Sequence, residues 1–483
     1  MRTGYNVLKN FIYMVFSNAV ARVLSLVTVV YLANILGPDN FGRLNWAMVF
    51  VSYFAVAADF GRSITAARDL SADKSRLNEL IGKALGFKLF FSILAFILCL
   101  LTAIILRREY EDRLLIFFSG LTIFTSVTFF LSWAFQGLED MKHLGYSLIL
   151  QSFVYAIAVL WLTNKTTPVY IMAVILFLSQ AAAVIYQFYA LKKFYLQQKL
   201  KFNFSDIPST AARTAHITWS HFTLILGQNS PLFLIGLFSS PAAAGFFAAS
   251  QKISSLVWEV ISNFSNVLFP ALARNFTKEP AKFNKIANYS LKLTFAALTP
   301  LLSSIAVLSY SITEFIYGNA FIESYWTLKI IIFLPLFMFL DSLATNILII
   351  SGRQKETSLI KTFVVFSAFI LSALSVRKMG INSVAIIFVS SFLVSAAWQY
   401  KKVSDFLIID WKNCVLLPVL FSSISAAVIF YIKNFSLLLA FLCATAGYSA
   451  MIYFYGLFDS QERDYIKNNI KTLKNRFLNL EFQ

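Results

Sequence analysis

Apolar residues recur along almost the whole chain in runs of roughly 20 residues, with short polar segments between them. A helix rises about 1.5 Å per residue, so a run of this length crosses the ~30 Å hydrocarbon core of a bilayer. The predicted helices, about fourteen in number, are centred near Arg22, Phe50, Ile93, Phe124, Ala156, Phe177, Ile225, Glu259, Ala297, Met338, Phe369, Val389, Val419 and Leu442. We therefore expect an all-α polytopic membrane protein.

The composition supports a membrane protein and also predicts its orientation. Hydrophobic residues make up 58% of the 483 residues and charged residues only 13%, whereas about a quarter are charged in soluble domains. Most of the 41 lysine and arginine residues fall in alternate connecting segments, which the positive-inside rule assigns to the cytoplasm together with both termini. The net charge of +18 then indicates contact with anionic membrane lipid rather than with nucleic acid.

One short turn occurs twice. LGPDNFG at 36–42 and SSPAAAG at 239–245 both place a glycine four residues after a proline, between two long apolar runs. The helix after each turn ends in a similar pattern, TAARDLS at 65–71 and ALARNFT at 271–277. Both pairs of landmarks are offset by about 200 residues, which is typical of two halves built from one repeated unit.

A six-helix unit repeated in the same orientation gives two pseudo-symmetric lobes with a cavity between them. We expect an N-lobe over residues 1–195, a cytoplasmic linker over 196–212, a C-lobe over 213–403 and two extra C-terminal helices within 404–458. In the tail, 459–483, apolar residues recur at three- and four-residue steps, with lysines off that stripe. The tail is therefore predicted to be an amphipathic helix on the inner leaflet, or alternatively a solvated and frayed one.

Polar residues inside the predicted spans are the best evidence about function, because an ionisable group there costs ~3 kcal/mol and usually faces a polar interior. Three cations fall inside spans: Arg22, Lys252 and Lys329. The helix centred on Glu259 carries a polar stripe on one face, formed by Lys252, Glu259, Asn263 and Asn266. The stripe predicts one wall of a wet cavity. Alternatively, Lys252 and Glu259 satisfy partners on neighbouring helices.

The first predicted helix places Asn18 and Arg22 one turn apart near its centre. A guanidinium presents a fork of donors that matches phosphate oxygens, so a diphosphate is a sensible ligand for Arg22. A fixed ion pair with Glu259 or Asp341 is the alternative. Gln228, on the seventh predicted helix, is a further candidate for lining the same cavity.

Acidic residues inside the spans are candidates for ion coupling or gating. Asp59 and Arg62 lie near the inner end of the second predicted helix and either pair with each other or act as a gate. Asp341 and Glu259 are candidates for binding a proton or a sodium ion, with Thr345 one turn after Asp341. We expect all four charged residues to act in coupling or gating rather than in catalysis.

Several motifs typical of enzymes do not occur in the sequence. It contains no G-x-x-x-x-G-K-[ST], no H-E-x-x-H and no G-x-S-x-G. The three cysteines are far apart, so neither a metal site nor a cofactor is predicted. The predicted outer loops are also too short to hold the acceptor and donor of a glycan polymerase or ligase. Transport is therefore favoured over catalysis.

The order of several segments resembles a known family. The first half contains LGPDNFG, then LNWAMVFVSYFAVAADFGRSITAARDLS, then WAFQGLEDMKHLGYSLI after the fourth helix; the second half contains SSPAAAGFFAASQKIS and ISGRQKETSLIK. This order is similar to that of polysaccharide flippases of the Wzx type, within the superfamily that also holds lipid II flippases and multidrug and toxic-compound extrusion proteins. The likeness covers essentially the whole chain.

The resemblance implies a V-shaped pair of lobes in the bacterial inner membrane that work by alternating access. The implied substrate is an undecaprenyl-diphosphate-linked oligosaccharide, an O-antigen or capsule repeat unit, carried to the periplasmic leaflet with use of an ion gradient. Arg22 and Lys252 are similar in placement to cavity cations of lipid II flippases. The protein partners expected for such a flippase are a glycan polymerase and a chain-length regulator. A multidrug or small-molecule antiporter and a membrane-embedded glycan polymerase or ligase are the alternatives.

Overall fold

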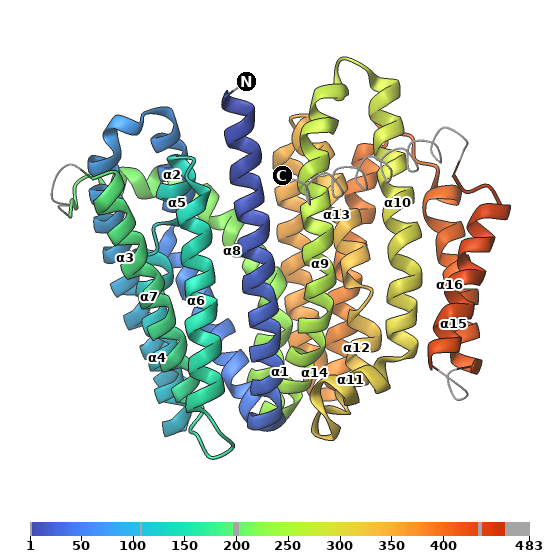
Figure 1. The fold of residues 1–483 in the computed structure, drawn as a ribbon, viewed down its shortest axis with the longest axis horizontal. Coiled ribbons are helices and arrows are strands. Elements are labelled where there is room, and N and C mark those ends of the chain that lie inside the picture. Colours follow the sequence, from blue (N-terminus) through green and yellow to red (C-terminus); the bar gives the residue numbers. More distant parts are fainter. Residues whose placement is uncertain (1, 107–108, 197–201, 433–436, 459–483) are drawn as a thin grey trace, which may run out of the picture. The chain divides into compact units, whose positions relative to one another are not determined.

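The structure, a computed structural model, describes residues 2–106, 109–196, 202–432 and 437–458 (Figure 1). Its regular secondary structure in these ranges is entirely helical. The prediction of an all-α chain is therefore confirmed. The predicted amphipathic tail, 459–483, lies outside the described residues.

Helices follow one another along the chain with short connections (Figure 1). The first half contains α1 (Arg2–Asp59), α2 (Arg62–Ala72), α3 (Leu77–Ile105), α4 (Tyr110–Ile123), α5 (Ser132–Gly137), α6 (Met141–Leu162) and α7 (Tyr170–Phe194). The second half contains α8 (Ile207–Phe238), α9 (Pro241–Phe276), α10 (Pro280–Val307), α11 (Ser309–Tyr317), α12 (Ser324–Ile331), α13 (Leu334–Ile350), α14 (Gln354–Val403), α15 (Leu417–Ile432) and α16 (Leu437–Phe454). Shorter pieces are the 3₁₀ turns Lys74–Arg76 and Asn319–Phe321 and the π-helical turns Phe124–Thr128 and Lys412–Leu416.

Within the described residues, 11 helical segments are long and apolar enough to cross a membrane. Two of them, of 47 and 50 residues, are too long for one span and each contains a glycine with non-helical backbone: Gly37 (φ 67°) and Gly380 (φ 73°). These left-handed residues end one helix and let the next begin, a role that glycine fills without a steric penalty. All of the predicted helix centres fall in helical segments once these two breaks are counted.

Prolines mark the starts of several helices. Pro38 follows the break at Gly37, Pro241 opens α9 and Pro280 opens α10. The first turn of a helix tolerates proline because its backbone nitrogen has no partner there. Helices α12 and α13 are separated by a break, and Pro335 lies in the first turn of α13.

Internal contacts divide the chain into two compact units, which are described separately. The first comprises Met1–Lys252, Thr313–Thr327 and Ser358–Ser391; the second comprises Ile253–Ile312, Leu328–Thr357 and Phe392–Gln483. Helices α9, α11, α12 and α14 contribute residues to both units. In the first unit, a core around Leu70, Ile81 and Phe135 holds α2, α3 and α5 together. In the second, the core includes Phe283, Phe339 and Tyr400 from α10, α13 and α14.

Candidate functional site

The predicted polar stripe lies along α9, on the more exposed side of the helix. Lys252, Asn263 and Asn266 are exposed and Glu259 is half-buried. The opposite side of α9 packs through small residues: Ser254 donates to the Ile331 carbonyl at 3.0 Å, and Ser265 hydrogen-bonds Ser342 of α13 at 2.8 Å. The packed face thus consists of small and apolar side chains, and the long polar side chains are left on the accessible face.

The other predicted cavity residues are placed on two helices of the first unit. Asn18 and Arg22 are half-buried on α1. Ser17, the residue before Asn18, is buried against α6. A Cβ added at Gly145 of α6 would lie 2.3 Å from the Ser17 hydroxyl oxygen. Gln228 is half-buried on α8, where its backbone carbonyl accepts a hydrogen bond from Gln251 at 3.2 Å.

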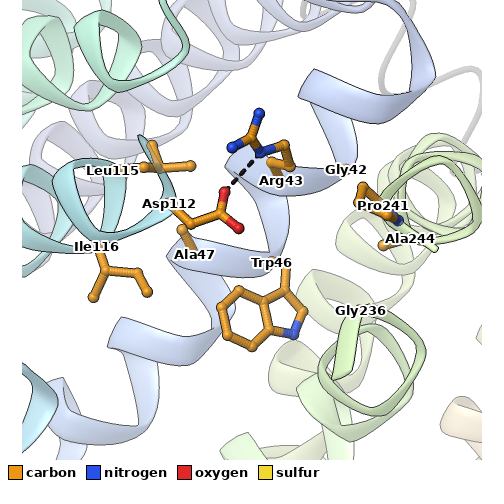
Figure 2. Close-up of a pocket in the computed structure, with 10 residues that line it drawn as sticks. All are labelled: Gly42, Arg43, Trp46, Ala47, Asp112, Leu115, Ile116, Gly236, Pro241 and Ala244. Carbon is orange, nitrogen blue, oxygen red and sulfur yellow. Dashed lines mark hydrogen bonds and ion pairs between the residues drawn. The ribbon is translucent and has the colours of Figure 1, made fainter. Parts of the chain in front are cut away.

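The two repeated turns lie against each other. A Cβ at Gly42 would lie 1.9 Å from the Pro241 carbonyl oxygen and 2.6 Å from the Gly245 nitrogen. Reciprocally, a Cβ at Gly245 would lie 2.1 Å from the Pro38 carbonyl oxygen. Each helix therefore offers a glycine to the first turn of the other, and neither position has room for a side chain. Figure 2 shows Gly42 facing Pro241 and Ala244.

A tryptophan extends this contact one turn further. Trp46 of α1 lies against Gly236 of α8, where a Cβ would be 2.0 Å from the indole ring (Figure 2). Its indole nitrogen donates to the Phe233 carbonyl at 2.9 Å. Farther along, Asn229 donates to Ser52 at 3.1 Å. The second half of α1 is thus joined to α8 by close backbone packing and by two hydrogen bonds.

Arg43 lies beside this crossing and binds carboxylates of α4 and of the residue before it. Its guanidinium is 2.6 Å from Asp112 (Figure 2). It also lies 3.2 Å from Glu111 and 3.9 Å from Glu109. The Arg43 and Asp112 side chains are less than a fifth exposed. Because the pair is partly shielded from water, it fixes the start of α4 against α1 more strongly than a surface pair would.

A buried lysine was missed in the sequence. Lys88 was assigned to a cytoplasmic segment, but it lies inside α3 and is only 1% exposed. Its ammonium contacts the Asp59 carboxylate at 3.0 Å, the Ser63 hydroxyl at 2.6 Å and the Val127 carbonyl at 3.2 Å. Asp59 therefore pairs with Lys88 and not with Arg62, whose guanidinium lies 3.8 Å from Asp69. The three cations expected inside the spans therefore leave out a lysine that is buried within helix α3, which begins eleven residues before it.

The second unit contains a buried polar cluster around Asp341 of α13. The carboxylate, 5% exposed, accepts hydrogen bonds from Ser395 at 2.5 Å and Gln399 at 2.6 Å. The Gln399 carbonyl in turn accepts from Thr345 at 3.0 Å and from Thr357 at 2.6 Å. Asp341 and Thr345 were predicted together. Ser395 and Gln399 were not, although two polar residues one turn apart in an apolar run could have revealed them.

This cluster is rich in oxygen atoms that could hold a small cation. Carboxylate, hydroxyl and amide oxygens are the ligands that hard cations prefer. Among the described residues, no group of three or more histidine, cysteine, aspartate or glutamate side chains is arranged to hold a metal ion. The described partners of the Asp341 carboxylate thus include the hydroxyl of Ser395 and the amide of Gln399.

Comparisons with known proteins agree on the class of this chain. A family model described as polysaccharide biosynthesis protein matches residues 7–276. A protein of Escherichia coli strain K12 named "Putative O-antigen transporter" is 22% identical over 270 residues, which are 55% of this chain and 64% of that protein, so the match spans less than two thirds of the relative.

Two solved structures have a similar fold. One is titled as lipid II flippase MurJ in an inward closed conformation, with a TM-score of 0.74, 14% identity and coverage of 94% of this chain and 100% of that chain. The other is an inward-facing multidrug resistance transporter of the MATE family and MOP superfamily, with a TM-score of 0.64, 14% identity and coverage of 80% and 95%. At this level of identity the likeness shows the fold alone.

Proposed function

We propose that this chain, which belongs to the polysaccharide biosynthesis protein family, is a flippase for an undecaprenyl-diphosphate-linked oligosaccharide. It moves an O-antigen or capsule repeat unit from the cytoplasmic to the periplasmic leaflet of a bacterial inner membrane. The observation that carries the proposal is the accessible polar face of α9, from Lys252 to Asn266, within a helix long enough to span a membrane. The name of the Escherichia coli relative supports the substrate class.

The physical need for such a protein is clear from the substrate. Sugar hydroxyls and a diphosphate crossing hydrocarbon lose their hydrogen bonds to water, at several kcal/mol for each group left without a partner. Amide side chains such as Asn263, Asn266 and Gln228 can replace some of those hydrogen bonds. Arg22 and Lys252 can neutralise the diphosphate, and Asn18 can donate to the same group.

Opening and closing requires helices that can separate and return to one arrangement. The reciprocal glycine contact between the two repeated turns is suited to this, because it has few side chains to disentangle and one well-defined closed geometry. Arg43 and its carboxylates lie beside that contact and stabilise the closed arrangement. We propose that this region is the outer gate.

Asp341 is the proposed site of ion coupling, with Glu259 as a second candidate. A buried carboxylate held by hydroxyl and amide donors changes its hydrogen bonds when a proton or sodium ion binds. The Asp59–Lys88 pair is proposed to hold the inner end of α1 during this change. Asp341→Asn is expected to abolish transport driven by an imposed ion gradient while leaving the protein folded. Full gradient-driven transport by both Asp341→Asn and Glu259→Gln would exclude the coupling proposal.

The test of the flippase itself is the sidedness of lipid-linked repeat units in inner-membrane vesicles. Vesicles from a deletion strain should hold these units in the cytoplasmic leaflet, and the restored gene should deliver them to the periplasmic leaflet. Arg22→Ala and Lys252→Ala should reduce delivery, whereas Lys278→Ala, an exposed lysine beyond the end of α9, should not. Unchanged sidedness with loss of surface polymer would place the step after flipping and refute the proposal.

A further inference from the structure

The turn between α1 and α2 has an unusual backbone. Phe60 (φ 44°) and Gly61 (φ 69°) are consecutive left-handed residues, and a bulky side chain rarely adopts this conformation. The turn packs against the start of α8: a Cβ at Gly61 would lie 3.1 Å from the Ile217 side chain and 3.5 Å from the Thr214 carbonyl oxygen. The turn therefore holds Arg62, the next residue, beside the part of α8 that contains Arg213.

Arg62 is buried without the hydrogen bonds that a guanidinium requires. The residue is 7% exposed, and its Nε is buried with no hydrogen-bond partner. The nearest carboxylate oxygen, on Asp69, is 3.8 Å away, beyond hydrogen-bond distance, and that carboxylate already accepts from Arg68 at 3.1 Å. A buried charge without a matched acceptor is strongly unfavourable. Within the described ranges, the guanidinium of Arg62 thus lacks an anion that fits it.

The surroundings of Arg62 contain a second arginine, Arg213, as well as the carboxylates of Asp69 and Asp59. Asp59, three residues earlier, is occupied by Lys88. Burial lowers the pKa of the Arg62 guanidinium, and the nearby Arg213 guanidinium lowers this pKa further, while Asp69 and Asp59 act in the opposite direction. Arg213 is exposed, and its Nε donates to the Ser209 carbonyl at 3.3 Å, which leaves its terminal nitrogens available. Arg213 therefore lies near enough to Arg62 to act on its charge, while of the two nearby carboxylates Asp69 is 3.8 Å from Arg62 and Asp59 is paired with Lys88.

We propose that Arg62 and Arg213 form a binding subsite for a diphosphate group at the cytoplasmic ends of α1 and α8. The inference rests on the proposed function: the subsite is where the diphosphate of the lipid-linked substrate is first bound, before it reaches Arg22. A diphosphate fits because two guanidinium forks can each bind a pair of phosphate oxygens, and because its charge replaces the acceptor that Arg62 lacks.

The experiment measures diphosphate binding to the purified full chain in lipid nanodiscs. The probes are inorganic diphosphate and farnesyl diphosphate, and binding is read as the concentration at which each raises the unfolding temperature. Arg62→Gln and Arg213→Gln should each weaken binding by tenfold or more. Arg76→Gln, which removes a half-exposed arginine paired with Glu79, is the matched control and should bind as the wild type does. Asp69→Asn removes the carboxylate that competes with diphosphate for Arg62. This variant should therefore bind diphosphate as tightly as the wild type or more tightly.

Two results would overturn the subsite. One is unchanged diphosphate affinity of Arg62→Gln; a changed unfolding temperature beside it would make Arg62 a structural residue. The other is displacement of both probes by phosphatidylglycerol vesicles at lower concentrations, which would assign the arginines to the headgroup of a bulk lipid.

Failure of the subsite and failure of the flippase proposal give different results. If the wild type binds diphosphate through Arg62 but the vesicle assay shows no delivery, the flippase proposal fails and the subsite remains. The other case is a wild type that delivers repeat units. If the Arg62→Gln variant then also binds diphosphate and delivers repeat units at the wild-type rate, only the subsite proposal fails.

Discussion

Alanine at Gly42 or Gly245 is expected to force the two repeated turns apart. The added Cβ at Gly42 would lie 1.9 Å from the Pro241 carbonyl oxygen, and at Gly245 it would lie 2.1 Å from the Pro38 carbonyl oxygen. Both distances are far inside van der Waals contact, and both neighbours are backbone atoms that cannot rotate away. The helices must move, and overpacking of this kind costs about 1–3 kcal/mol.

That cost falls only on the arrangement in which the turns touch. Since about 1.4 kcal/mol changes an equilibrium tenfold, each single variant should shift the population toward the separated arrangement by about five- to a hundred-fold. The double variant Gly42→Ala with Gly245→Ala should cost much less than the two single costs added together, because helices already separated by one methyl group have room for the second.

The assay combines thermal unfolding with cysteine labelling. Ala244 is buried at the contact, so Ala244→Cys, made in a Cys443→Ser background because Cys443 is exposed, should resist a membrane-impermeant maleimide. Either glycine variant should make this cysteine reactive and lower the unfolding temperature. Gly447→Ala is the control, because a Cβ there would meet no atom within 4 Å. If Gly42→Ala and Gly245→Ala behave like Gly447→Ala in both measurements, the close contact is wrong.

Further substitutions test three other contacts. Lys88→Met and Asp59→Asn should each destabilise the protein by about 3–5 kcal/mol, because each leaves a buried partner without its hydrogen bonds. Chemical denaturation should show that the double variant recovers most of this loss. Additive losses in the double variant would contradict a direct pair. Gln399→Leu should lower the free energy of unfolding by about 1.5–3 kcal/mol for each charged hydrogen bond lost. It should also reduce gradient-driven delivery of repeat units. Delivery at the wild-type rate would argue against a role for the cluster around Asp341. Asp112→Asn should lower the unfolding temperature more than Glu111→Gln, because Glu111 is two-thirds exposed and Asp112 is not; equal effects would contradict this ranking.

Helix positions were predictable because the membrane imposes a length on every apolar run. The sequence also placed the polar residues of α9 on one face of the helix, since they follow the helical period. The exposed positions of Lys252 and Asn263 agree with that period. Local periodicity is information that a single sequence contains.

Pairings between distant residues were not predictable in the same way. Lys88 was assigned to a connecting segment, and only the structure shows that Asp59 lies 3.0 Å from its ammonium. Likewise, Asp341 was identified as a buried acid, but its donors come from positions more than 50 residues later. Nothing in the period of either helix encodes which turn of another helix it will meet.

The repeated turn is a case in which sequence and structure explain each other. In a contact between two similar surfaces, each partner must supply both the part that protrudes and the part that receives it. Here the first helical turn after each proline protrudes, and the glycine four residues later receives the other turn. A chain with the motif in only one half would bring a carbonyl oxygen against a side chain on one side of the contact. The same short motif is therefore needed twice, because the two copies are binding sites for each other.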